Sequence, residues 1–409
     1  MAIIKPFKAL KYNPKLYKIM SDIICPPYDV VKDSEIKTYL NKNPYNVIRI
    51  ELPECEGSYE NVKNTFDDWK KNNVLIKDDD ECIYIYEMNF KINDKVTKLT
   101  GIICLVKVDD LDKGSIIPHE ITFKKAKKDR FSLIKSINCN TSPIYSLFDG
   151  KDKKIFNILK ILTDKKEDIS AIDEYNVTHK LWKISDREEI NKLIDYFKNK
   201  DLFIADGHHR YETAIKYKNY CKAFSNKTAN YTMMLLVDFF SDALVMLPTH
   251  RVLRLNDNFD VTGLKNILVK YFLIEERKDI YNIENILNKN SILGKKVIGF
   301  FYKGKTWFLL TLKKDVNLSN FSCETQLLND LILNKLFNNT SINKLIYTRE
   351  LKEVFNLVND NGFDCSFILP KLTKENLMSI FLRGIKLPQK TTYFYPKPVT
   401  GFVMNEIDF

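Results

Sequence analysis

The chain has 409 residues, of which 44% are hydrophobic and 29% are charged, a balance typical of a soluble globular protein. This length corresponds to about two or three domains and is sufficient for a sizeable core. The apolar runs are much shorter than the ~18 residues that a membrane helix needs, and the N-terminus lacks the apolar stretch of a secretory signal. We therefore expect a cytoplasmic protein that does not enter the membrane.

The net charge of +11 raises the question of a nucleic-acid partner. Lysine is dispersed through the whole chain beside Asp and Glu, which indicates a compositional bias and not a basic stripe. Only 9 of the 64 basic residues are Arg, so the use of Arg suggests a need for a planar, bidentate donor. Four of the nine, Arg49, Arg130, Arg210 and Arg251, fall in polar segments that carry candidate site residues.

The eight cysteines are scattered and form no C-x-x-C pair. Their spacing matches neither a zinc site nor a disulfide framework. We expect them to be mostly buried, reduced thiols.

Hydrophobic periodicity and turn residues predict the elements of the N-terminal half. The prolines of residues 1–50, with Pro26-Pro27-Tyr28-Asp29, indicate an extended loop, and residues 47–52 alternate like a strand. In chain order, the other predicted elements are a helix over 60–73, strands over 82–90 and 95–108 joined through Asn93-Asp94, a polar stretch over 113–149 and a helix over 187–200.

A short strand over 202–205, a turn at 206–207 and a helix over 209–220 follow, and then a pair of strands over 231–238 and 243–247. Beyond about residue 255 the pattern predicts a helix over 260–272, a hairpin over 296–312 and a helix over 323–337. Strands and helices do not alternate regularly, which favours the α+β class. We expect an N-terminal α+β domain over 1–254 and a C-terminal α+β region over 255–409.

The strongest chemical signal is Asp206-Gly207-His208-His209-Arg210, where the predicted strand turns into a helix. Glycine permits close approach of a ligand, and the free N–H groups of a helix N-terminus favour an anion. The two histidines can donate hydrogen bonds, and Arg210 can hold two oxygens. Asp206 would be repelled by bare phosphate, so it is a candidate Mg²⁺ ligand, a carboxylate aimed at a hydroxyl, or only a helix cap.

A second polar segment contains His119-Glu120, Lys124 and Asp129-Arg130. His119 and Glu120 are candidates for acid–base catalysis, and Glu120 also for metal ligation, although the second histidine of a zincin motif is absent. Lys124 and Arg130 are candidate phosphate ligands. The alternatives are a solvated basic run for Lys124 and a simple ion pair for Arg130.

The third segment is His250-Arg251, at the end of a strand expected to neighbour the Asp206 strand, and both residues are candidate phosphate ligands. Arg49 and Glu51 lie in the predicted strand over 47–52, either as a salt bridge or as substrate contacts. Four of the five histidines fall in the three polar segments, which suggests that these segments converge on one site.

The C-terminal segment 388–401 mixes lysines, threonines and aromatics between prolines. It either lies against the site, where it stacks on a base or places a lysine on a phosphate, or packs its aromatics in the core.

These motifs resemble, along nearly the whole chain, the bacterial and archaeal family known as domain of unknown function 1015. The resemblance is carried by the following segments: 6–12, 26–30, 44–49, 118–120 with Thr122 and 129–130, 142–145, 205–214, 247–251 and 388–401. One departure is Ile121, where the family pattern has a basic residue, so an oxygen clamp at this position is not expected.

The Asp-Gly-His-His-Arg string is similar to the phosphate-binding box of the ParB/sulfiredoxin-like superfamily, and free-serine kinases carry the same string. The resemblance implies a ParB/sulfiredoxin-like mixed core with large insertions. It also implies that Gly207, His208, His209 and Arg210 hold nucleotide phosphates and that Asp206 lies beside the transferred group. The catalytic carboxylate should come from an earlier segment, and Glu51 and Glu120 are the candidates.

The resemblance thus favours a kinase that uses ATP or ADP with Mg²⁺ to phosphorylate a small hydroxylated metabolite, L-serine first, with a homodimer as one possible state. Sulfinic-acid reduction is disfavoured because residues 206–210 contain no cysteine. A nucleotide-binding switch or nucleic-acid-associated module of partition type remains the alternative, although no helix-turn-helix with a basic recognition helix is evident. A hydrolase that uses His and Asp is a third hypothesis.

Overall fold

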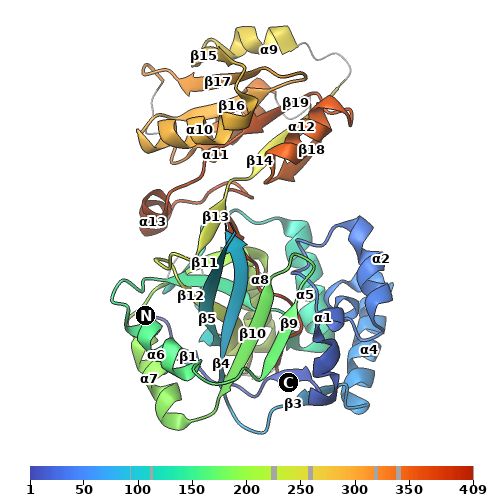
Figure 1. The fold of residues 1–409 in the computed structure, drawn as a ribbon. Helices are drawn as coiled ribbons and strands as arrows, with labels where there is room; N and C mark the ends of the chain where they lie inside the picture. The colour runs from blue at the N-terminus through green and yellow to red at the C-terminus, as the bar shows by residue number, and fades with distance from the viewer. Residues whose placement is uncertain are drawn as a thin grey trace. The chain divides into compact units, whose positions relative to one another are not determined.

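The computed structural model describes residues 1–92, 94–110, 114–222, 228–256, 261–316, 321–337 and 342–408. Asn93, Lys113 and Asp260, which belong to predicted segments, lie outside the described residues. The chain forms two compact units (Figure 1). The first comprises residues 1–118, 122–245 and 394–409, and the second comprises residues 119–121 and 246–393. Helices and sheets are mixed in both, which confirms the α+β class.

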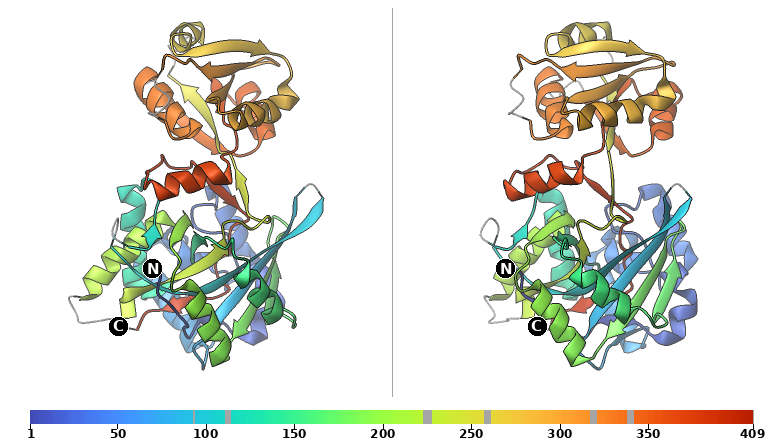
Figure 2. Two further views of the ribbon diagram at one scale, coloured as in Figure 1. Left: turned by 90° about the vertical axis from the view of Figure 1, so that its left-hand side faces the viewer. Right: turned by 60° about the vertical axis from the view of Figure 1, so that its left-hand side comes forward.

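A nine-stranded mixed sheet forms the centre of the first unit. Its strands follow the order β6-β11-β8-β12-β5-β4-β10-β9, and β1 pairs with the end of β5. The strands are β1 (Ile4–Lys5), β4 (Ile83–Ile92), β5 (Lys95–Lys107), β6 (Ile116–Ile117), β8 (Ile144–Phe148), β9 (Ile169–Ile172), β10 (Thr178–Ile184), β11 (Leu202–Asp206) and β12 (Tyr231–Asp238). The antiparallel β4–β5 ribbon, which Figure 2 shows reaching beyond its neighbours, confirms the predicted hairpin.

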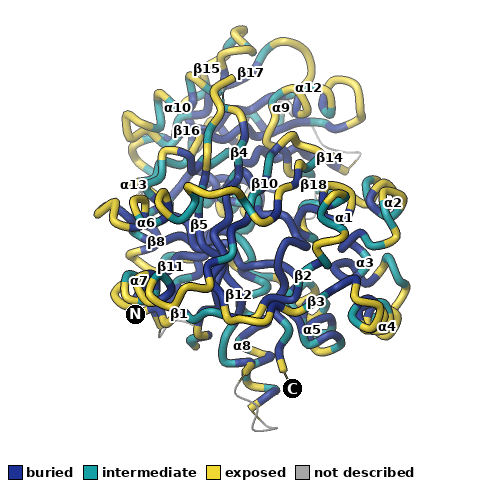
Figure 3. The backbone as a smooth tube through the Cα atoms, turned by 60° about the horizontal axis from the view of Figure 1, so that its bottom comes forward, coloured by how far each residue is buried: buried dark blue, intermediate teal, exposed yellow. Residues whose placement is uncertain are grey.

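Three helices cover one face of this sheet: α6 (Lys154–Leu162), α7 (Arg187–Phe197) and α8 (His208–Lys222). Helix α7 begins where the Asp186 carboxylate accepts a hydrogen bond from the Glu189 N–H, and its residues Leu193 and Phe197, one turn apart, point into the core. Figure 3 shows the buried strands at the centre of the unit and the exposed outer sides of the helices. The predicted helices over 187–200 and 209–220 are confirmed.

The remaining elements of the first unit bring the N- and C-terminal segments together. The helices are α1 (Met20–Ile23), α2 (Asp33–Lys42), α3 (Ile48–Glu51), α4 (Tyr59–Lys71) and α5 (Lys124–Ile137). Short sheets pair β2 (Leu10–Tyr12) with β3 (Leu75–Lys77) and β7 (Cys139–Asn140) with β21 (Asn405–Glu406). The last residues of the chain therefore form part of the first unit, beside the α5–β7 segment.

Two sequence-based predictions in this unit are wrong. Residues 48–51 form the helical turn α3 and not a strand, because Asn46 folds the chain locally: its side chain accepts from the Ile48 N–H and donates to the Asp22 and Ile24 carbonyls. The turn is buried on nearly all sides, so its apolar residues only imitate an alternating strand. Strand β12 does not pair with residues 243–247; it pairs with β5 and β8, while β13 (Val245–Leu247) belongs to a separate small sheet.

The second unit is built on a six-stranded antiparallel sheet with the order β15-β17-β16-β19-β14-β18. These strands are β14 (His250–Leu255), β15 (Phe272–Arg277), β16 (Val297–Phe301), β17 (Trp307–Leu312), β18 (Ile342–Thr348) and β19 (Cys365–Ile368). One face packs on α9 (Val261–Leu268) and on α11 (Glu324–Leu327) with its π-helical continuation (Leu328–Leu336). The other packs on α10 (Ile283–Ile292) and α12 (Leu351–Asn359).

The hairpin predicted over 296–312 is confirmed as β16–β17. The predicted helix over 260–272 is shorter than expected, because Phe272 already begins β15. The expectation that the His250 strand neighbours the Asp206 strand is wrong: β14 pairs with β18 and β19, whereas β11 pairs with β6 and β8. Within the described ranges, no helix is both long enough and apolar enough to span a bilayer.

The packing of α7 on the central sheet of the first unit can be tested by mutation. Phe197 is fully buried and its ring lies 4.8 Å from that of Phe148, whereas Phe156 on α6 is 63% exposed. Replacing Phe197 with Ala should lower the free energy of unfolding by about 3–5 kcal/mol, because the cavity cannot close fully. The matched change Phe156→Ala should cost less than about 0.5 kcal/mol. Urea unfolding measures both, and equal losses would contradict the proposed packing.

Candidate functional site

The segment from Asp206 to Arg210 has the predicted strand–turn–helix geometry. Strand β11 ends at Asp206, Gly207 has a φ of +93°, and α8 begins at His208. A positive φ is adopted at little cost only by glycine, which explains the residue at this turn. The Tyr211 N–H bonds to the Gly207 carbonyl at 2.9 Å, so the amides of the first helical turn point back toward the end of β11.

Arg210 connects this turn by hydrogen bonds to the residues just before the neighbouring strand β8. Its guanidinium donates to the Asp206 carboxylate at 3.0 Å, to the Ser142 hydroxyl at 3.0 Å and to the Pro143 carbonyl. The Arg210 Nε is buried and has no hydrogen-bond partner among the described residues. A buried donor without a partner is costly, so this nitrogen is a candidate contact for a ligand oxygen.

Asp206 has a second cationic partner from the C-terminal segment. The Lys397 ammonium lies 2.7 Å from one Asp206 oxygen and 3.4 Å from an Asp29 oxygen. The Asp206 carboxylate is therefore bracketed by Arg210 on one oxygen and by Lys397 on the other.

The extended loop of Pro26–Asp29 contributes a second wall to the same region. The Tyr28 ring lies 4.2 Å from the centre of the Arg130 guanidinium. Burial raises the pKa of Tyr28, with Asp29 adding to the rise, while Arg130 and Arg210 act in the opposite direction. The contact of Arg130 with Tyr28 brings this loop beside α5, and Lys397, which lies near both Asp29 and Asp206, connects the loop to the turn before α8.

Tyr145 on β8 is the cross-strand partner of Asp206. Burial raises the pKa of its phenol, and the negative charge of Asp206 adds to the effect. The hydroxyl is fully buried and has no hydrogen-bond partner within the part of the chain that the structure describes. It is a second polar group next to Asp206 that is available to a ligand.

Glu51 lies on the far side of Arg210, at the end of α3. Its carboxylate accepts hydrogen bonds from the hydroxyls of Thr141 and Ser142, and the Arg130 guanidinium lies 3.4 Å away. Ser142 also accepts from Arg210, so one hydroxyl joins Glu51 to the Asp206–Arg210 turn. Burial raises the pKa of Glu51 despite the nearby arginines. A buried carboxyl with a raised pKa is a candidate for proton transfer.

A cavity of about 40 Å³ lies beside Glu51 and Arg210. Glu51, Arg130, Ser142, Arg210 and Thr213 contribute to its wall. The Thr213 hydroxyl, like the Arg210 Nε, is buried without a partner among the described residues. The volume holds a few water molecules or the end of a small polar ligand, but not a whole nucleotide.

His209 contacts the start of α5. Its Nε2 accepts the Phe123 N–H at 3.0 Å, so the proton of the neutral ring resides on Nδ1. Glu212, one turn further along α8, accepts from Thr122 and from Lys127. Lys124 begins α5 and lines an exposed basic surface with Lys127, Lys128 and Lys216. His208 is buried at the first position of α8.

Arg130 forms an ion pair with Asp129, at 2.6 Å, which was one of the two alternatives that the sequence allowed. It also donates a hydrogen bond to the backbone carbonyl of Glu51. Of the two alternatives for Arg49 and Glu51, a salt bridge between them is not formed, because Arg49 bonds to Glu56 at 2.9 Å and Glu51 pairs with Arg130. In this arrangement Arg130 holds Glu51 and Tyr28 in place. Its direct contact with phosphate stays a prediction.

The remaining candidates belong to the second unit. The His119 Nε2 lies 3.0 Å from the Thr392 hydroxyl, and Glu120 accepts from the same hydroxyl at 3.4 Å. His250 accepts the Leu369 N–H on Nδ1, and burial lowers its pKa. Arg251 donates to the carbonyls of Thr249, Gln389 and Lys390, and burial lowers its pKa to about 10.

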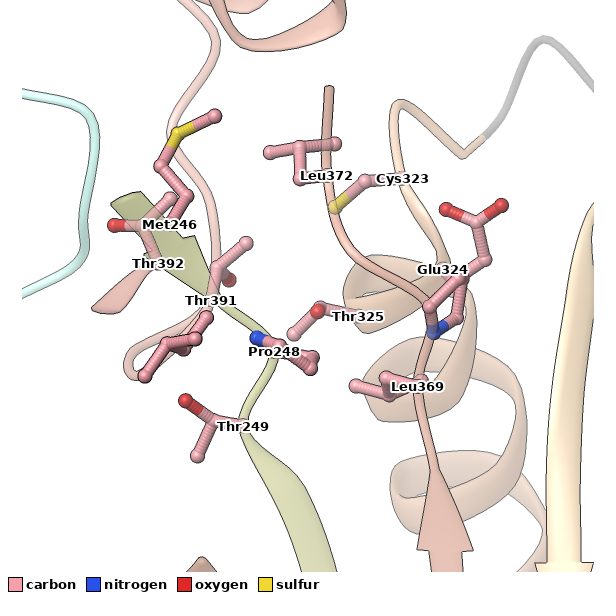
Figure 4. Close-up of a pocket in the computed structure, with 12 residues that line it drawn as sticks. Met246, Pro248, Thr249, Cys323, Glu324, Thr325, Leu369, Leu372, Thr391 and Thr392 are labelled. Atoms are coloured by element: carbon pink, nitrogen blue, oxygen red, sulfur yellow. The ribbon is translucent and has the colours of Figure 1, made fainter. Parts of the chain in front are cut away.

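A small pocket lies in this part of the second unit (Figure 4). Figure 4 shows Thr391 and Thr392 on one side of Pro248, and Cys323 with Thr325 on the other. The volume is about 10 Å³, at the lower limit for one water molecule. His208 and His209 belong to the first unit and His119 and His250 to the second, and the convergence of these histidines on one site stays a prediction.

In the first unit, the structure thus brings together Asp206, Gly207, Arg210, Glu51 and Arg130. The sequence-based site omitted Tyr28 and Asp29, and Ser142, Thr141, Tyr145 and Thr213, all of which contribute to it. The segments 26–30 and 142–145 were among those that carry the family resemblance, and this was the available signal. Among the described residues no group of three or more His, Cys, Asp or Glu could hold a metal ion.

Comparison with known proteins identifies the family. The sequence matches the family described as "Protein of unknown function (DUF1015)" over residues 4–337, and the chain belongs to it. A search of curated proteins finds no match.

The solved structures that this chain matches include a free serine kinase variant in complex with AMP, which is 14% identical with a TM-score of 0.42 and is aligned over 75% of this chain and 92% of its own. A conserved hypothetical protein from Pyrococcus furiosus is 14% identical with a TM-score of 0.39, over 74% of this chain and 93% of its own. C-terminally truncated SbnI from Staphylococcus aureus is 12% identical with a TM-score of 0.39, over 74% and 86%.

The turn at Gly207 can be tested against a matched glycine. A Cβ at Gly207 would lie 3.0 Å from the Arg210 Nε, whereas at Gly57, which has a φ of +81°, it would meet nothing within 4 Å. We expect Gly57→Ala to lose about 1 kcal/mol of stability from backbone strain alone. Gly207→Ala should lose about 1–3 kcal/mol more, because Arg210 is pushed from Ser142 and Pro143. Urea unfolding gives both values, and indistinguishable losses would show that Arg210 is not held as described.

Proposed function

We propose that this member of the family is a nucleotide-dependent kinase that phosphorylates the hydroxyl of a small metabolite, with free L-serine as the first acceptor to test. The observation that carries the proposal is the turn from β11 into α8, where Asp206, Gly207 and Arg210 form a preorganised polar end of a helix. The same Asp-Gly-His-His-Arg string in free-serine kinases supports it.

The proposed nucleotide is ATP or ADP, bound with its phosphates at the N-terminus of α8. The backbone amides of the first helical turn and the positive end of the helix dipole favour such an anion. The Arg210 Nε and the Tyr145 hydroxyl, both buried without a partner among the described residues, would supply further hydrogen bonds. His208 and His209 are proposed to flank the phosphates from the same turn.

A Mg²⁺ ion would find one carboxylate ligand in this region. It commonly takes one or two carboxylates together with substrate phosphates, and the Asp206 carboxylate lies at the turn. When bound, the ion would neutralise phosphate charge.

The transfer itself requires one proton acceptor. The oxygen of the acceptor hydroxyl forms a bond to the terminal phosphorus, and the bond from that phosphorus to the bridging oxygen breaks. The products are the phosphate ester and a nucleotide shorter by one phosphate, and the hydroxyl proton moves to a carboxylate. Glu51 is the proposed base because it lines the cavity next to Arg210 and its pKa is raised. His119 and Glu120 remain proposed acid–base groups of the second unit.

The test uses the purified full-length protein with ATP or ADP, Mg²⁺ and a panel of hydroxylated amino acids beginning with L-serine. We expect O-phosphoserine, identified by mass spectrometry, in an amount equal to the nucleotide consumed. Phosphate release without an acceptor would instead indicate a hydrolase. Nucleotide binding with neither product would indicate a switch, and absence of nucleotide binding would overturn the assignment of the Asp206–Arg210 turn.

The role of Glu51 predicts a specific kinetic result. Glu51→Gln should reduce kcat by about 10²–10⁴-fold, because the amide cannot accept the proton. In the unmodified protein, kcat/KM should fall as the pH drops through a pKa above the ordinary glutamate value, since only the ionised carboxylate is a base and burial raises its pKa. The matched change Glu87→Gln, in a buried glutamate bonded to Asn89 and Thr100, should leave kcat within about twofold. Equal effects of the two changes would remove Glu51 from the chemistry.

A further inference from the structure

The C-terminal segment Phe394–Phe409 returns to the first unit and is fixed on both sides of Lys397. Before the lysine, the Tyr395 ring packs edge-on against Phe90 at 5.4 Å. After it, the Val399 N–H donates to the Tyr86 hydroxyl at 3.1 Å, and Thr400 exchanges backbone hydrogen bonds with Cys25. Lys397 is thus presented by a segment whose path is set by the central sheet.

These contacts place the lysine at the candidate site. Its side chain is only 8% exposed, and its ammonium lies between the carboxylates of Asp206 and Asp29. Thr400 forms a β-bridge with Cys25, which precedes the loop that carries Asp29. The segments that carry Lys397 and Asp29 therefore run side by side to the site.

The position of the lysine points to a role in addition to its ion pairs. Asp206 already binds Arg210 through its other oxygen, and the ammonium reaches Asp29 only at the longer distance of 3.4 Å. Burying an ammonium is expensive unless all its partners repay the lost hydration. An ammonium has three donors on a flexible stem, so it can keep a carboxylate contact while donating to a phosphate oxygen.

We propose that Lys397 is a phosphate-contacting residue of the nucleotide site, so that the C-terminal segment completes a site begun by Asp206–Arg210. This inference rests on the proposed function, because the phosphate it contacts is that of the bound nucleotide. In the ligand-free protein, Asp206 and Asp29 hold the ammonium in position. When the nucleotide binds, Lys397 and Arg210 contact its phosphates from opposite sides of the Asp206 carboxylate.

The experiment compares the affinities of ADP and adenosine by isothermal titration calorimetry with the full-length protein. Lys397→Met keeps most of the apolar stem and removes the charge. We expect it to weaken ADP binding by about 10- to 100-fold and to leave adenosine binding unchanged, because adenosine has no phosphate. Lys397→Arg should retain ADP affinity within about tenfold, since it keeps a charged donor.

The control is Lys180→Met on β10, which removes a lysine whose ammonium lies 3.3 Å from the Glu167 carboxylate, and it should not alter either affinity. Thermal melting checks that each variant is folded. If Lys397→Met does not fold, Lys397→Gln replaces it as the uncharged variant. Unchanged ADP affinity in a folded, uncharged variant overturns the inference while the proposed function stands. An equal loss for ADP and adenosine also overturns it, because that is the result of a purely structural role. Failure of the unmodified protein to bind ADP or ATP overturns the proposed function itself.

Discussion

The candidate site depends on the Asp206 carboxylate, which binds two cations that reach it from different parts of the chain. Arg210 arrives from one turn further along α8, and Lys397 arrives from a segment almost two hundred residues away. Because Gly207 has a positive φ, Asp206 and Arg210 can lie on the same side of the turn within hydrogen-bonding distance. The same arginine then reaches Ser142 and Pro143, so the turn is also fixed to the strand beside it.

From this turn the interactions extend to Glu51 through one hydroxyl. Ser142 accepts from Arg210 and lies 3.5 Å from Glu51, and Arg130 approaches Glu51 from α5. Arg130, Arg210 and Glu51 therefore line one cavity, and Asp206 bonds to Arg210 at the turn beside it. Such an arrangement can receive an anion next to Arg210 and still keep a proton acceptor nearby, which is the combination that phosphoryl transfer to a hydroxyl requires.

The sequence predicted the site best where the signal was local. The strand, the glycine turn and the helix at 202–220 could be predicted because each has its own composition and they are adjacent in the chain. The role of the Tyr28–Asp29 loop and of Lys397 could not be derived from spacing, because long-range strand and bridge contacts such as Cys25 with Thr400 bring them to the turn. The helical turn at 48–51 resembles a strand in the sequence, because a segment buried on nearly all sides lacks the hydrophobic periodicity that distinguishes a helix from a strand.

The use of arginine, in a chain whose basic residues are mostly lysine, has a physical explanation at several positions. Arg130 and Arg210 each bind a carboxylate and a backbone carbonyl at the same time, and Arg251 spans three carbonyls. A planar guanidinium with five donors in fixed directions can do this, whereas an ammonium is a point charge without preferred directions. Lys397 differs from these arginines: it is nearly as buried, and its ammonium contacts the carboxylates of Asp29 and Asp206. Arg130 and Arg210 fix the geometry of the site through several directed hydrogen bonds, and Lys397 adds a positive charge that lies near two carboxylates.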